Sequence, residues 1–142
     1  MLSAMHYTVT FLEYEVVTEQ ATQLVLSFPF TIVDSDLIGS PEERSLTQTR
    51  KVIVTVSHHK RIIWNRLGLA NEDLPKVLFE YAKRYVKQIV ESDSLPNDYT
   101  IPMPMITDNS HPGPCQFEIS RLRMPDGVTI EAEAKPSMGF HT

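Results

Sequence analysis

The stretch NEDLPKVLFEYAKRYVKQIVES, residues 71–92, decides the fold because it reads as one long amphipathic α-helix. Its apolar residues recur at spacings of three and four, which places them in a broad stripe along one side of a helix. The stripe consists of Leu74, Val77, Leu78, Tyr81, Ala82, Tyr85, Val86, Ile89 and Val90. Asp73 is the expected N-cap, because it puts Pro75 at the second helical position, where no hydrogen bond is lost. We therefore predict a helix over residues 73–91.

The segments around this helix have the alternating apolar pattern and β-branched residues of strands. The predicted strands are residues 6–17, 22–33, 50–57, 115–122 and 128–134. The first two are expected to pair as an antiparallel hairpin, and a Pro-Asp-Gly turn joins the last two. Pro29 lacks an N–H group, so its strand should be an edge strand or bulged at that point. The Pro- and Met-containing segment 101–106 must be extended.

A shorter helix is predicted at residues 58–67, after Ser57 as N-cap and before Gly68 as the terminating residue. The resulting order is roughly β-β-β-α-α-β-β. Runs of strands on either side of a helical pair are typical of the α+β class. We predict an α+β fold in which the long helix at 73–91 covers one face of an antiparallel sheet.

Length and composition indicate one soluble domain over residues 1–142, with a loosely held tail at 136–142. No apolar run approaches the ~18–20 residues of a membrane span, and no secretory leader is visible. The single cysteine excludes an internal disulfide and favours a reducing compartment, so a cytoplasmic location is expected. The five glycines are isolated, which argues against the glycine-rich loops that hold nucleotides. We expect no cofactor.

Charge is distributed unevenly along the chain, whose formal net charge is −5. No acidic residue occurs between Glu43 and Glu72, and this zone, 44–66, is rich in basic residues. Such clusters bind phosphates or acidic proteins, and an aromatic side chain can stack on an unpaired base. The predicted binding residues are Arg50, Lys51, His58, His59, Lys60, Arg61, Trp64 and Arg66. The structural alternative is a solvated end of a strand and a helix, with Trp64 in the core.

A second group of candidates consists of metal-binding or nucleophilic residues. His58, His59, His111 and Cys115, with Asp108 nearby, are chemically suited to bind zinc. However, adjacent histidines on a helix diverge by about 100°, and the remaining spacing matches no zinc module. Cys115 starts a predicted strand, whereas reactive cysteines favour helix N-termini or neighbouring cations. We therefore predict no metal ligand and no catalytic residue.

The sequence thus favours a binding or assembly module over an enzyme. We expect this module to contact an acidic partner or nucleic acid through the zone 44–66. We expect a homodimer that forms through a sheet edge or through the wide stripe of the long helix. We expect no contact with a membrane. One alternative is a small metal-dependent or Cys/His hydrolase-like enzyme. Another is a structural adaptor or inhibitor of a second protein, which the adaptable methionines of segment 101–106 would serve.

Overall fold

The computed structural model describes residues 5–92, 98–103 and 121–134, and it has the predicted mixed α+β class. The described strands, which form one six-stranded sheet, are β1 (Met5–Phe11), β2 (Glu15–Gln20), β3 (Gln23–Asp34), β4 (Gln48–Ser57), β5 (Tyr99–Pro102) and β6 (Thr129–Ala134). The described α-helices are α1 (Glu43–Leu46), α2 (His58–Arg66) and α3 (Leu74–Glu91). Two 3-10 helices, η1 (Ser35–Leu37) and η2 (Asn71–Asp73), precede α1 and α3. The predictions for residues 104–106, 115–120 and 136–142 lie outside the described residues.

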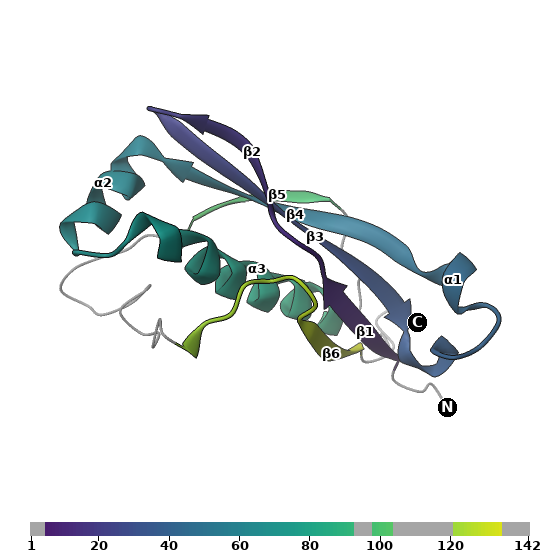
Figure 1. The fold of residues 1–142 in the computed structure, drawn as a ribbon. Helices are drawn as coiled ribbons and strands as arrows, with labels where there is room; N and C mark the ends of the chain where they lie inside the picture. Colours follow the sequence, from purple (N-terminus) through teal and green to yellow (C-terminus); the bar gives the residue numbers. More distant parts are fainter. Residues whose placement is uncertain (1–4, 93–97, 104–120, 135–142) are drawn as a thin grey trace, which may run out of the picture.

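Contrary to the prediction, the sheet is not antiparallel throughout, because β5 runs parallel to β4. The strand order is β5-β4-β3-β1-β6, with β2 also paired to β3. Parallel neighbours cannot be joined by a tight turn and need a long crossover connection. Since α2 and α3 lie between β4 and β5 in the chain, they form this crossover. Figure 1 shows α2 at the end of the sheet and α3 returning along one of its faces.

The first predicted strand, residues 6–17, is divided into β1 and β2. Both pair with β3, β1 with its second half and β2 with its first half. Between them, the N–H of Leu12 donates to the carbonyl of Pro29 at 3.0 Å, but Pro29 has no N–H group to donate in return. The proline therefore interrupts the neighbouring strand. Its own strand is neither an edge strand nor bulged there, since β3 lies between β4 and β1 in continuous register with β4.

The core lies between α3 and the face of the sheet that β3 and β4 share. The sheet contributes Leu24, Leu26, Phe28, Phe30 and Ile32 from β3, and Val52, Val54 and Val56 from β4. The helix contributes Leu74, Val77, Leu78, Phe79, Ala82, Val86 and Val90. Phe79 connects the two layers, because its ring centroid lies 4.9 Å from that of Phe11 and 6.1 Å from that of Phe28.

The buried side of α3 is rotated relative to the stripe read from the sequence. That stripe omits Phe79, which is fully buried, and includes Tyr81 and Tyr85, which are only partly buried. Phe79 is followed after seven residues by Val86, so both lie on the same row of the helix.

Among the described residues, no helix has both the length and the apolar character needed to cross a membrane.

Replacing Phe79 by Ala should destabilise the protein by about 3–5 kcal/mol, the usual loss for truncating a buried aromatic residue. Urea unfolding followed by circular dichroism measures this change. Gln88→Ala, at an exposed position of the same helix, is the control and should change stability by less than about 0.5 kcal/mol. Equal effects of the two substitutions would contradict the packing described for Phe79.

The phenol of Tyr85 provides a test at alkaline pH. Burial raises the pKa of Tyr85, and the neighbouring Tyr99 raises this pKa further. Because the unfolded chain then loses this proton first, the contribution of Tyr85 to stability is present below its unfolded pKa of about 10 and is lost as pH rises through the folded pKa. Tyr85→Phe should therefore lose less stability than the unmodified protein when urea unfolding is compared between about pH 9 and pH 11. An unchanged pH dependence would argue against this assignment.

Candidate functional site

α2 is held to the sheet from its first turn onward. The hydroxyl of Ser57, the N-cap residue, accepts a hydrogen bond from the backbone N–H of Lys60 at 3.3 Å. The backbone N–H of His58 donates to the carbonyl of Thr22 at 3.1 Å. After the helix, Gly68 has a φ of 76°, which residues with a side chain rarely adopt, and the chain turns back toward α3. A side-chain cap and a backbone hydrogen bond to the β2–β3 turn therefore fix the start of α2.

Trp64 lies on the inner side of α2 and is fully buried. Its indole N–H donates to the carbonyl of Ala70 at 3.0 Å, as buried tryptophans usually require. This bond ties the connection between α2 and α3 to the core. Trp64 is thus a core residue, as in the structural alternative, and has no face available for stacking on a base. Trp64 therefore does not contribute to an exposed contact surface.

Two cations of α2 bond to strands that flank the central β3–β4 pair on opposite edges. The ammonium group of Lys60 donates to the carbonyl of Met103, directly after β5. The guanidinium group of Arg61 donates to the carbonyl of Gln20 at 3.0 Å, at the end of β2. Carbonyl acceptors satisfy these N–H donors but are neutral, so both positive charges still contribute to the potential around α2.

The outward side of α2 carries the remaining basic and titratable residues of the helix. We define the α2 face as the exposed residues His58, His59 and Arg66. His59 and Arg66 are almost two turns apart and lie on the same side of the helix, separated by roughly 10 Å along its axis. The Nδ1 atom of His58 lies 3.0 Å from the carbonyl of Ala21, which fixes this ring at the edge of the face. The helix itself contains no acidic residue.

The structure does not bring Arg50 and Lys51 together with the α2 face. They lie near the start of β4, and an extended chain places Lys51 roughly 23 Å from His58. Figure 1 shows β4 running from the side of α1 to α2, so the two ends of this strand lie far apart. The guanidinium group of Arg50 also bonds to the side chain of Gln48 at 2.7 Å. The acid-free zone 44–66 is therefore divided into two separate basic areas.

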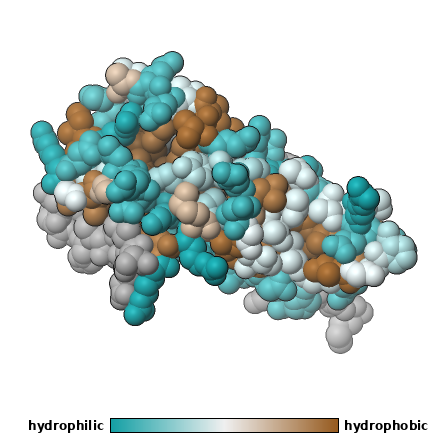
Figure 2. Space-filling model, viewed as in Figure 1, coloured by the Kyte–Doolittle hydropathy of each residue, from teal (hydrophilic) through white to brown (hydrophobic). Residues whose placement is uncertain are grey.

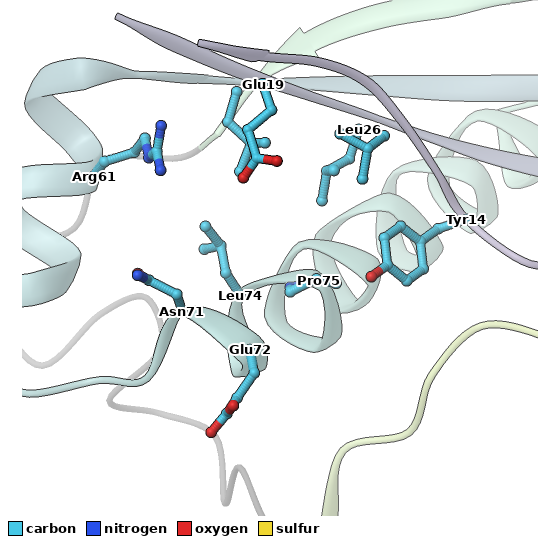
Figure 3. A pocket seen from close by; sticks show the side chains of 10 residues that line it. Tyr14, Glu19, Leu26, Arg61, Asn71, Glu72, Leu74 and Pro75 are labelled. Carbon is cyan, nitrogen blue, oxygen red and sulfur yellow. The ribbon is translucent and has the colours of Figure 1, made fainter. Parts of the chain in front are cut away.

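A groove opens between the β2–β3 hairpin and the connection from α2 to α3 (Figure 3). We call this cavity of about 270 Å³ the hairpin groove. It is lined by Tyr14, Val16, Glu19, Leu24, Leu26, Arg61, Asn71, Glu72, Leu74 and Pro75. Val16 and its neighbour Val17 are 52% and 56% exposed. Figure 2 shows hydrophobic surface at the end of the molecule that carries β2 and α2, and a smaller amount near the opposite end. The groove thus combines an apolar floor with a charged rim.

A β-bulge in β2 determines which side chains reach this groove. Val16 pairs with Leu26 and Glu19 pairs with Leu24, whereas Val17 has no partner in the register. In a regular strand, residues three apart point to opposite faces. The extra residue therefore turns Val16 and Glu19 toward the same face. Neither groove residue was predicted as a binding residue, since no pattern in the sequence marks the bulge.

Glu19 and Arg61 both extend into the hairpin groove, from different walls (Figure 3). In the described part of the chain, no ion pair joins them, although the groove is small. The bond to the carbonyl of Gln20 orients Arg61. This bond uses only one of the five N–H donors of the guanidinium group. The groove therefore presents a carboxylate and a guanidinium group that are not bonded to each other.

The metal and cysteine candidates are not assembled by the described residues. Asp108, His111 and Cys115 lie outside them. His58 and His59 are described, and nowhere among the described residues do three His, Cys, Asp or Glu side chains gather in a way that could hold a metal ion.

Comparison of the chain with models of protein families, with curated proteins and with solved structures gave no match.

Proposed function

We propose that this chain is a binding module that contacts an acidic segment of a partner protein through the α2 face. The observation that carries the proposal is the exposure of His58, His59 and Arg66 on a helix without acidic residues. The charges of Lys60 and Arg61 lie on the same helix and add to the positive potential. An acidic partner would be attracted to this end of the molecule although the chain as a whole carries a net charge of −5.

Nucleic acid is the second candidate partner, and two features favour the acidic protein over it. Trp64 is buried, so the zone has no described aromatic platform for an unpaired base. Arg50 and Lys51 lie at the other end of β4, so the cations do not form one track along which a phosphate backbone could run. We therefore treat nucleic-acid binding as an outcome that the experiment must distinguish.

The other predicted interactions gain less support from the described residues. Of segment 101–106, Met103 is fully buried and donates its N–H to the carbonyl of Thr55 at 2.9 Å, so it faces the core rather than a partner. A homodimer stays a prediction, as does the hydrolase-like alternative. Against a dimer through sheet edges, β2 is bulged, β5 includes Pro102 and β6 carries Glu131 and Glu133. These are features by which proteins keep exposed edges from pairing.

The proposal is tested by fluorescence anisotropy with a labelled oligoglutamate peptide and with short single-stranded DNA and RNA. We expect the peptide to bind at low salt and to dissociate as salt is raised. The double substitution His59→Glu/Arg66→Glu should weaken binding by at least about tenfold, because it reverses the positive charge at residue 66 and adds a second negative charge at residue 59. The control is Arg44→Glu/Lys51→Glu, which reverses two exposed positive charges near the other end of β4 and changes the net charge slightly more than the test variant does.

Three results would overturn the proposal. The first is that the peptide does not bind at any salt concentration. The second is that both double variants lose affinity equally, which would remove the α2 face as the contact surface. The third is that DNA or RNA binds and the peptide does not, which would establish the nucleic-acid alternative instead.

A further inference from the structure

The hairpin groove has the size and the lining of a site for a small ligand. Its volume of about 270 Å³ is close to the lower end of the range of ~300–1,000 Å³ found for ligand pockets. Leu24, Leu26 and Leu74 form a floor that is already buried from solvent at 8%, 1% and 3% exposure. The exposed apolar surface above this floor belongs in part to Val16, which lines the groove and is 52% exposed. A compact apolar part of a ligand would be stabilised by covering this surface.

The rim of the groove restricts the ligand further. Arg61 offers several N–H donors in a planar fork, which suits a carboxylate group. Glu19 accepts hydrogen bonds and suits an ammonium group. Because Glu19 and Arg61 both extend into the groove and no ion pair joins them, each has its charge available to a ligand that lies between them. We propose that the hairpin groove binds a free α-amino acid with an apolar side chain, with its carboxylate on Arg61 and its ammonium group on Glu19.

Other classes of occupant fit the groove less well. A nucleotide or another polyanion would meet the carboxylate of Glu19, which repels phosphate. A purely apolar ligand would remove water from both charged groups without replacing its hydrogen bonds. A peptide strand added along β2 would meet the bulge at Val17, where the regular ladder is interrupted. A compact zwitterion with an apolar side chain satisfies the floor and both rim charges.

The test is a titration of the ¹⁵N-labelled full chain with L-leucine, followed by two-dimensional NMR. We expect saturable shifts of the backbone amides of Glu19, Arg61 and Asn71 at low-millimolar ligand. N-acetyl-L-leucine lacks the ammonium group and L-leucinamide lacks the carboxylate. Each should bind about tenfold more weakly, because one charged hydrogen bond is lost. These two ligands also imitate the last and the first residue of a peptide, so they distinguish a free amino acid from a chain terminus.

Variants separate recognition by the groove from effects on the fold. Glu19→Gln and Arg61→Gln should each weaken leucine binding by about tenfold. Glu15→Gln is the matched control, since Glu15 lies on the same strand but pairs with Ser27 and does not line the groove. Glu19 is exposed, so its substitution tests the site even if the Arg61 variant disturbs the tie between α2 and the hairpin.

The proposal is overturned if leucine causes no saturable shift. It is also overturned if L-leucinamide or N-acetyl-L-leucine binds as tightly as leucine, or if Glu19→Gln has no larger effect than Glu15→Gln. The titration does not involve His59 or Arg66, so its outcome is independent of the test for the acidic partner.

Discussion

The parallel pairing of β4 with β5 is the constraint on which the rest of this structure depends. Two parallel neighbours must be connected across a face of the sheet, and here that connection consists of α2 and α3. α2 therefore stands at the end of β4, and α3 must run back beneath the strands. The burial of Phe79 between Phe11 and Phe28 then fixes the depth at which α3 lies. Both the exposed basic side of α2 and the hairpin groove follow from this route of the chain.

Much of the secondary structure could be predicted because it depends on local patterns. The α+β class follows from alternating apolar residues in the strands and from the spacing of three and four in residues 71–92. The parallel β5 could not be predicted, since strand direction depends on pairing between residues that are distant in the chain. The division of the first strand has a local cause in the sequence, Pro29, but its effect falls on the neighbouring strand, to which no sequence pattern points.

The residues of the candidate site could be predicted only in part, because their positions in space depend on the length of β4, on hydrogen bonds to the sheet and on the bulge in β2. The acid-free zone is visible in the sequence, but sequence order does not show that β4 separates Lys51 from His58 by most of its length. Nor does it show that Lys60 and Arg61 use their N–H groups on carbonyls of the sheet. The position of Glu19 in the hairpin groove could not be predicted, because the orientation of its side chain depends on one extra residue in β2. α2 thus combines two roles, since its inner cations hold the fold together and its outer residues remain available for contact.

The pairing of β1 with β6 has a consequence for how the protein is made. β1 lies near one end of the described chain and β6 near the other, and Met5 pairs with Ala134. During synthesis the amino-terminal strand emerges long before its neighbour does, so one of its sides stays unpaired while the ribosome completes the chain. Contacts between such distant segments also slow folding, because a large loop must close before they form. The nascent protein therefore passes through a stage in which an incomplete sheet is exposed to other chains.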